Sequence, residues 1–369
     1  MRLRRSAVGG PGLRRVRRGK GFSYHGPDGG AVTDEDTLRR VRELAIPPAW
    51  RQVWICPHHN GHIQAVGTDA AGRRQYLYHA RWQQERAEEK FDRVLRMAPG
   101  LPAARDRISA DLDGSGLGRD RVLALALYLL DRGYFRAGGE SYAEENNSYG
   151  IATLLCEHVT VHRNAVRFDY PAKHGIQRNW EIDDPAVVAA VRELLRAGPD
   201  CPRQSVPDGG RQSVPNGGRQ SDPDGGRLLV CRTGSGWAEV KAEDLNTRFK
   251  ELLGEDYSVK DMRTWHGTVL AAAAFVEADP PANKTVRKRV QAAVMREVSD
   301  ELGNTPAVAR SSYVDPRVVQ AYEMGMTIAT SARRAAKAHD RDTAQAILEK
   351  GTARMIRTIA KGAGRTRRR

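Results

Sequence analysis

The segment from Arg119 to Phe135, RDRVLALALYLLDRGYF, constrains the fold of this 369-residue chain more than any other. It is the most apolar of the helical patterns in the sequence, and such a helix has to be buried against other elements. We therefore expect it at the core of the larger of two domains, which is the domain number that this chain length favours. No apolar run in the sequence is long enough to cross a bilayer.

The larger domain is predicted to be mainly helical, with one β interruption. Helical patterns begin near Arg81 and continue to the C-terminus. Between them, the segment 158–182 alternates apolar and polar residues around two turns, at 163–164 and 171–175. This alternation is typical of β-strands, and we interpret the segment as a three-stranded antiparallel meander.

The N-terminal part reads as a small β-rich domain. The strand-like segments 53–57 and 61–69 flank the turn residues HHNG, which predicts a hairpin. A further strand follows up to about Tyr78, and one helix is expected near 34–45. The predicted fold class is α+β: a small β-rich N-terminal domain and a larger, mainly helical domain with a small antiparallel sheet.

Basic segments bound the two domains. We expect a mobile basic arm at 1–20, the β-rich domain at 21–85, the helical domain at 86–362 and a basic tail at 363–369. Residues 199–227 interrupt the helical domain with three tandem octapeptides, RQSVPDGG, RQSVPNGG and RQSDPDGG. These copies carry no hydrophobic face, so we interpret them as a flexible surface insertion.

Charge and cysteine usage narrow the partners and the compartment. The chain has 60 Lys and Arg against 45 Asp and Glu, a net charge of +15. A folded, strongly basic protein is typical of those that bind a polyanion, with nucleic acid ahead of an anionic membrane surface. The four cysteines are far apart, which favours a reducing compartment over a disulfide scaffold. With no apolar signal core, a cytoplasmic location is expected.

Tyr313 stands between two predicted helix starts. Thr305-Pro306 and Asp315-Pro316 each read as an N-cap followed by a proline at the first helical position. Because the residue before a proline avoids the α region, the first helix should end at or before Asp315. Such a joint could give a phenol the exposure that a nucleophile needs. On this stretch alone, an ordinary interhelical tyrosine is the stronger interpretation.

Cations occur at three further places in the helical domain. Lys260 and Arg263 lie one turn apart before an alanine-rich helix, where they could meet a phosphate at the helix N-terminus. Arg136 follows the most apolar helix and precedes two glycines. Lys173 lies at the tip of the predicted β-hairpin. Each is also compatible with a simple role: a solvated turn, a helix end and an exposed charge.

In combination and in this order, these motifs resemble the type IB DNA topoisomerases, most closely the compact kind found in poxviruses and bacteria. The resemblance runs from about Phe22 to the last helix. The segment 44–79 is similar to the family's DNA-gripping N-terminal domain. The motifs RGYFRAGGESYAEENNSYGIATL, KDMRTWHGT and GNTPAVARSSYVDP are similar to its catalytic core.

The resemblance implies a chemistry for these residues. Tyr313 matches the nucleophile that becomes joined to a 3′ phosphate of DNA. Arg136 and Arg263 match the two arginines that hold the nonbridging oxygens, and Lys173 matches the general acid that protonates the departing 5′ oxygen. Strand swivelling and religation would then relax supercoils. The two domains are expected to form a clamp around duplex DNA.

Further positions match residues that contact DNA in the family. Asn304 stands where viral and nuclear members carry histidine, so it could stabilise charge but could not exchange protons near neutral pH. Lys260 matches a phosphate-contacting lysine. The other expected DNA contacts are Arg73, Arg74, Tyr76, Tyr78 and Tyr142.

The resemblance implies no ATP, no metal and no other cofactor, and a monomer associated with the bacterial nucleoid. Cys56, His58, His59 and His62 are close in sequence but have no second ligand cluster, which disfavours zinc. Two other functions stay open. A tyrosine recombinase shares the chemistry, but that family carries HxxR in place of KDMR and a helical N-terminal domain. A DNA-binding protein without catalysis is the third interpretation.

Overall fold

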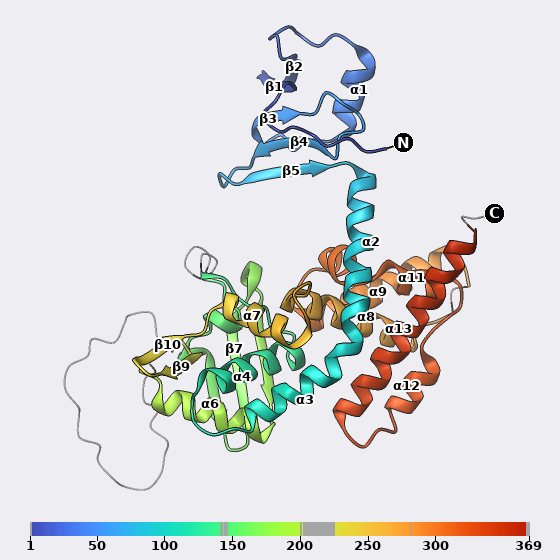
Figure 1. Ribbon diagram of the computed structural model, residues 1–369. Coiled ribbons are helices and arrows are strands. Elements are labelled where there is room, and N and C mark those ends of the chain that lie inside the picture. The colour runs from blue at the N-terminus through green and yellow to red at the C-terminus, as the bar shows by residue number, and fades with distance from the viewer. Residues whose placement is uncertain are drawn as a thin grey trace. The chain divides into compact units, whose positions relative to one another are not determined.

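The computed structural model describes residues 2–140, 143, 147–199, 201, 226–280 and 282–366. The chain divides into two compact units, Met1–Asp92 and Arg93–Arg369 (Figure 1). The division falls within helix α2 (Ala80–Met97). Tyr142 and most of the octapeptide segment lie outside the described residues.

The N-terminal unit is built on a five-stranded antiparallel sheet with the order β2-β1-β3-β4-β5. Its elements are β1 (Leu13–Arg18), β2 (Gly21–His25), α1 (Glu35–Glu43), β3 (Arg51–Ile55), β4 (Ile63–Thr68) and β5 (Arg74–Tyr78). The predicted helix and the β3–β4 hairpin are confirmed. The Asp34 side chain caps α1 by accepting a hydrogen bond from the Thr37 N–H at 2.8 Å.

The expected mobile arm at residues 1–20 is wrong for the segment that forms β1. This strand pairs with both β2 and β3, and Leu13 is buried in the core of the unit. The Arg15 guanidinium donates to the carbonyls of Ile46, Pro47 and Trp50 at 2.8–2.9 Å. The basic residues that suggested a mobile arm thus include one that joins the sheet to the loop before β3.

The larger unit is mainly helical around α4, as predicted. Its helices are α3 (Leu101–Leu112), α4 (Arg119–Arg132), α6 (Pro185–Ala197), α7 (Ala242–Leu253), α8 (Val259–Ala274), α9 (Lys284–Leu302), α10 (Pro306–Val308), α11 (Pro316–Glu323), α12 (Ala329–Ala335) and α13 (Arg341–Thr366). Helix α4 packs against α3, α6, α7 and α8, and its side chains from Val122 to Leu127 are all buried. Helix α13 runs to Thr366, so it includes the first four residues of the expected tail.

Two small antiparallel sheets belong to the same unit. The predicted meander is confirmed as β6 (Val159–His162), β7 (Ala165–Pro171) and β8 (Gln177–Ile182), with the short helix η4 (Lys173–Gly175) at the β7–β8 tip. The second sheet, β9 (Val230–Thr233) with β10 (Gly236–Glu239), was not predicted. The α+β class is confirmed.

The expectation against disulfides needs correction. Cys156, in the short helix η3 (Cys156–His158), is bonded to Cys201, whose Cα atom lies 5.5 Å away. The two cysteines are 45 residues apart in sequence, but the end of α6 returns to the start of the meander. Sequence separation therefore gave no measure of their distance in the fold.

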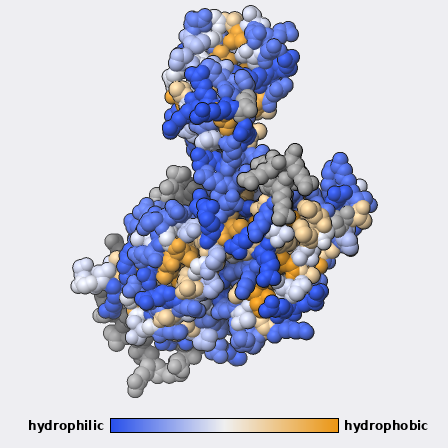
Figure 2. Space-filling model, turned by 45° about the vertical axis from the view of Figure 1, so that its right-hand side comes forward, coloured by the Kyte–Doolittle hydropathy of each residue, from blue (hydrophilic) through white to orange (hydrophobic). Residues whose placement is uncertain are grey.

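The visible surface in Figure 2 is mostly hydrophilic, with small scattered hydrophobic areas. Among the helices formed by the described residues, none is long and apolar enough to span a membrane. Within the same residues, no group of three or more His, Cys, Asp or Glu side chains is arranged to hold a metal ion.

Candidate active site

Tyr313 ends a π-helical turn, Ala309–Tyr313, that follows directly on α10. The Thr305 hydroxyl caps α10 by accepting from the Val308 N–H at 3.3 Å, and the Asp315 carboxylate caps α11 by accepting from the Arg317 N–H at 2.9 Å. Both predicted caps and the break before Asp315 are confirmed. A π-helical turn inserts a residue into the helical path, and such turns are frequent at functional sites.

The backbone of Tyr313 lies directly against α8. The Thr268 hydroxyl donates to the Tyr313 carbonyl at 3.1 Å and accepts from the Asp315 N–H at 3.1 Å. Gly267 leaves the space for this approach, because a Cβ atom there would lie 2.9 Å from the Tyr313 Cβ. The side chain of Tyr313 is half-buried.

Arg263 lies beside the Tyr313 ring. It comes from the same helix as Gly267, and its guanidinium carbon is 5.3 Å from the centre of the ring. Its two terminal nitrogens donate to the carbonyls of Tyr134 and Leu302. Burial, together with the charge of Arg136, lowers the pKa of Arg263 to about 10, so the guanidinium stays charged near neutral pH.

Arg136 approaches the same place from the loop after α4. Its Nη2 atom donates to the Gly303 carbonyl at 3.1 Å. Burial lowers the pKa of Arg136, while the nearby Tyr313 acts in the opposite direction. The structure thus brings Arg136, Arg263 and Tyr313 together, as the sequence interpretation requires.

A third guanidinium, which sequence reasoning missed, lies in this cluster. Arg178 on β8 donates to the carbonyl of Glu301 at 3.0 Å and to the carbonyl of Gly133 at 2.6 Å. Three consecutive carbonyls at the end of α9 therefore accept from three arginines: Glu301 from Arg178, Leu302 from Arg263 and Gly303 from Arg136. The last carbonyls of a helix lack partners within the helix and carry its negative dipole end, which favours cations there.

Asn304 follows this helix end and has a polar side chain without partners. It is 9% exposed, and neither its Oδ1 nor its Nδ2 atom has a hydrogen-bond partner in the described part of the chain. Gly303 adopts the left-handed conformation at φ 58°, and the Asn304 N–H donates to the Ser299 carbonyl at 2.9 Å. This αL helix end fixes where the amide lies.

The two lysines of the sequence interpretation lie on different elements. Lys173 opens η4 at the tip of the β7–β8 hairpin and is half-buried. Lys260 is exposed in the first turn of α8. At the N-terminus of α8, the Val259 N–H donates to the Asn246 side chain at 3.3 Å. The Asp261 carboxylate also accepts from the Ser258 N–H at 3.0 Å, which completes a capping box.

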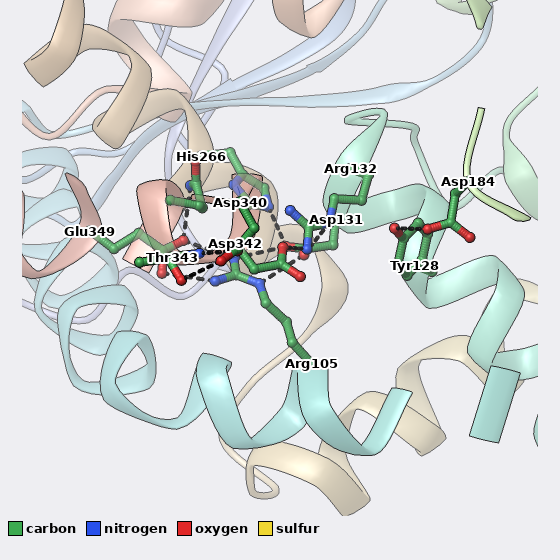
Figure 3. A network of polar contacts seen from close by, with 11 residues as sticks. Arg105, Tyr128, Asp131, Arg132, Asp184, His266, Asp340, Asp342, Thr343 and Glu349 are labelled. Carbon is green, nitrogen blue, oxygen red and sulfur yellow. Dashed lines mark hydrogen bonds and ion pairs between the residues drawn. The ribbon is translucent and has the colours of Figure 1, made fainter. Parts of the chain in front are cut away.

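A buried polar network supports α8 from the side of α13. Figure 3 shows Arg105 of α3 between the carboxylates of Asp131 on α4 and Glu349 on α13. The His266 Nε2 atom lies 2.9 Å from Asp131 Oδ1. His266 is one turn after Arg263, and its ring contacts the ring of Tyr134, with their centres 5.0 Å apart. The Tyr134 carbonyl therefore accepts a hydrogen bond from Arg263, and the Tyr134 ring contacts the ring of His266.

The predicted DNA contacts of the N-terminal unit lie on β5 or, for Arg73, directly before it. Tyr76 and Tyr78 of β5 are each 39% exposed, and their rings stack with centres 6.0 Å apart. The Arg74 guanidinium lies 5.8 Å from the centre of the Tyr76 ring. Arg73 forms an ion pair with Asp69 at 3.0 Å. Exposed aromatic faces beside cations are suited to bases and phosphates.

The site in the larger unit is suited to an anion with tetrahedral oxygens. Guanidiniums donate parallel hydrogen bonds to phosphate, and a buried amide without a partner gains one when an oxygen arrives. A phenol in contact with the same guanidinium can reach a phosphorus atom held there.

Comparison with known proteins gives the family. Residues 21–69 match the N-terminal domain of bacterial DNA topoisomerase IB, and residues 79–339 match the catalytic core of eukaryotic DNA topoisomerase I. The DNA topoisomerase 1B of Acanthamoeba polyphaga mimivirus is 27% identical over 316 residues, which cover 85% of this chain and 88% of that protein. A DNA topoisomerase 1 of Daucus carota is 30% identical over 112 residues, covering 30% of this chain and 14% of that protein. The chain belongs to the type IB DNA topoisomerase family.

Proposed function

We propose that this enzyme relaxes supercoiled duplex DNA by breaking and resealing one strand through Tyr313. The phenol oxygen attacks a backbone phosphorus, and a bond to the 3′ phosphate forms while the bond from phosphorus to the 5′ oxygen breaks. The phenol proton is lost to solvent, and the departing oxygen takes a proton from Lys173. The duplex then swivels, and the reverse attack restores the strand.

The observation that carries this proposal is the placement of Tyr313 beside two arginines. Arg263 and Arg136 can hold the nonbridging oxygens of the phosphate as negative charge builds on them. The side-chain amide of Asn304, which has no partner among the described residues, can donate a hydrogen bond to another phosphate oxygen but cannot exchange a proton with it. The energy of the broken bond is kept in the phosphotyrosine, so the cycle needs neither ATP nor metal.

We propose further that the two units act as a clamp on duplex DNA. Support comes from the stacked Tyr76 and Tyr78 beside Arg74 in one unit and the arginine cluster in the other. The enzyme would work as a monomer, because one copy carries every proposed catalytic residue. Since its substrate is DNA, we place it in the cytoplasm in association with the nucleoid. The net charge of +15 favours association with DNA and makes it sensitive to salt.

The proposal is tested by plasmid relaxation and by trapping the covalent intermediate. Negatively supercoiled plasmid should relax in EDTA without ATP, and detergent quenching on labelled duplex should leave a protein–DNA adduct. Tyr313→Phe should abolish both while DNA binding remains. Tyr322→Phe is the matched control, since the buried Tyr322 hydroxyl donates only to the Asp279 carbonyl among the described residues, at 2.8 Å.

The same assay separates the alternatives. Binding without an adduct under several salt conditions would identify a DNA-binding protein without catalysis. An adduct without relaxation of plasmids that lack defined sites would indicate a recombinase.

A further inference from the structure

We propose that Arg178 is a positioning residue for the departure of the 5′ oxygen, an inference that rests on the proposed role of Lys173. Arg178 follows the hairpin tip and faces Tyr170 across the β7–β8 pair, while Lys173 lies in the tip itself. The side chain of Arg178 leaves the hairpin and bonds to two other segments, the turn after α4 at Gly133 and the end of α9 at Glu301.

These two segments carry two further residues of the proposed site, Arg136 and Asn304. Gly133 lies three residues before Arg136, and Glu301 lies three residues before Asn304. Arg178 therefore joins the hairpin that carries the proposed general acid to the segments of Arg136 and Asn304. The guanidinium also lies 5.9 Å from the centre of the Phe135 ring, between the same segments.

The phosphate-binding groups do not depend on Arg178 for their own arrangement. Arg263 bonds to the carbonyls of both Tyr134 and Leu302, and Arg136 bonds to Gly303. The turn after α4 and the end of α9 thus stay connected through Arg263 when Arg178 is removed. Removal takes away the two hydrogen bonds that Arg178 makes from the hairpin to these segments.

If the hairpin is misplaced, we expect proton donation to the departing 5′ oxygen to be affected, and not the contacts to the nonbridging oxygens. Lys173 gives its proton to the 5′ oxygen as that oxygen leaves, whereas the arginines act on the nonbridging oxygens. A leaving thiolate needs no such proton, because a thiol is acidic near pKa 8.5 and an alcohol is not. Replacing the bridging 5′ oxygen by sulfur therefore removes the need for proton donation, while the nonbridging oxygens that the arginines contact stay the same.

The experiment compares single-turnover cleavage of two labelled duplexes that differ in one atom, a bridging 5′ oxygen or a bridging 5′ sulfur. Arg178→Ala should slow cleavage of the oxygen duplex by about 10²-fold, within the range of lost acid catalysis. The same variant should cleave the sulfur duplex at a rate within about threefold of the rate of the wild type on that duplex. Lys173→Ala should show the same pattern, and Arg263→Ala should be slow on both duplexes.

Control variants keep the result interpretable. Arg167→Ala removes an exposed arginine of the same hairpin, whose carboxylate neighbour Asp169 is on its own strand at 3.9 Å, and should leave both rates unchanged. Arg178→Lys keeps the charge but loses the two-pronged reach, so its oxygen rate should fall less than that of Arg178→Ala. Cleavage of the sulfur duplex at nearly the wild-type rate also shows that Arg178→Ala and Lys173→Ala are folded.

Distinct outcomes overturn the inference. A sulfur duplex that rescues Lys173→Ala but not Arg178→Ala assigns Arg178 to the phosphate and sinks the positioning role. Wild-type cleavage of the oxygen duplex by Arg178→Ala sinks it as well. If sulfur does not rescue Lys173→Ala, the acid is wrongly assigned and the inference falls with it, while the adduct at Tyr313 still decides the proposed function.

Discussion

The guanidinium of Arg263 lies against the ring of Tyr313, with its carbon atom 5.3 Å from the ring centre. Both residues are positioned by α8: Arg263 is part of it, and the Tyr313 carbonyl accepts a hydrogen bond from Thr268 on the same helix. The proposed nucleophile and one proposed phosphate ligand are therefore held by one rigid element. A change on α8 that displaces the Tyr313 backbone should therefore lower the cleavage rate more than it lowers DNA affinity.

Gly267→Ala is the most direct such change. The new methyl group would lie 2.9 Å from the Tyr313 Cβ and 3.0 Å from its carbonyl oxygen, so the π-helical turn has to shift. A displacement of this kind can cost about 10²-fold in rate, and we expect that loss in single-turnover cleavage with DNA affinity nearly unchanged. Gly362→Ala on α13 is the control, because nothing lies within 4 Å of its added methyl group. Equal rates for Gly267→Ala and wild type would contradict the arrangement.

Asn304→Ala should separate activity from stability. Its amide atoms are buried without partners in the described structure, and leaving such groups unpaired costs about 1–3 kcal/mol. Removing them should leave the melting temperature equal or higher, while cleavage slows by about 10²-fold through loss of a donor to the phosphate. Asn246→Ala should behave in the opposite way, since Asn246 bonds to both Ala242 and Val259. A marked loss of stability in Asn304→Ala would show that the amide has a structural partner.

Asp131→Asn should change how the enzyme responds to acid. Burial alone would raise the pKa of Asp131, but His266 and Arg105 outweigh it and hold the pKa far below its usual value. The ionised Asp131 therefore stabilises the folded state fully at pH values above the unfolded pKa of about 3.9. This contribution to the free energy of unfolding decreases as the pH falls from there toward the lower pKa of the folded state. Removing the buried Asp131 charge from its contacts with Arg105 and His266 should lower the free energy of unfolding by about 3 kcal/mol at pH 7.

Melting temperatures measured between pH 7 and pH 2 test this prediction. Asp131→Asn should start lower at pH 7, and below about pH 4 the wild type should lose more stability with falling pH than the variant does. Asp279→Asn is the matched control, because the Asp279 side chain is 70% exposed in its ion pair with Arg289. Parallel curves for wild type and Asp131→Asn would rule out the network as a source of acid sensitivity.

Arg74 and Arg73 should differ in their contributions to DNA binding. Arg73 already faces the Asp69 carboxylate at 3.0 Å, whereas Arg74 lies over the Tyr76 ring. Each phosphate contact contributes about 0.9 to the slope of log affinity against log salt. Arg74→Ala should reduce that slope by about one, and Arg73→Ala by clearly less. Binding titrations at several salt concentrations measure both, and a larger effect of Arg73→Ala would place the contact elsewhere.

Local signals in the sequence predicted much of the larger unit. The caps at Thr305 and Asp315 each consist of one side chain that accepts from an N–H group two or three residues later. A short stretch of sequence is therefore enough to specify each cap. The meander was also visible, because its turns and alternation lie within one short segment. The order of Arg136, Lys173, Arg263 and Tyr313 indicated the family, although each residue alone has an ordinary structural interpretation.

Contacts between distant segments were not predictable in the same way. Arg178 has no local signal that sets it apart from other charged strand residues, and only the fold brings it to Glu301, 123 residues later. The strand β1 was hidden because its basic residues resembled a solvated arm, whereas Arg15 donates to three carbonyls of another segment. The pairing of Cys156 with Cys201 likewise depends on where α6 ends.

The bond between Cys156 and Cys201 has a further consequence for the octapeptide repeats. Cys201 precedes them, and the Cys156 N–H donates at 2.9 Å to the carbonyl of Gly226, which ends them. Entry and exit of this segment are thus fastened to one residue, so copies can be gained or lost in evolution without altering the spacing of the helices around it. The same point offers engineers a place to graft a foreign loop or a second binding module while the arrangement of Arg136, Arg263 and Tyr313 stays as it is.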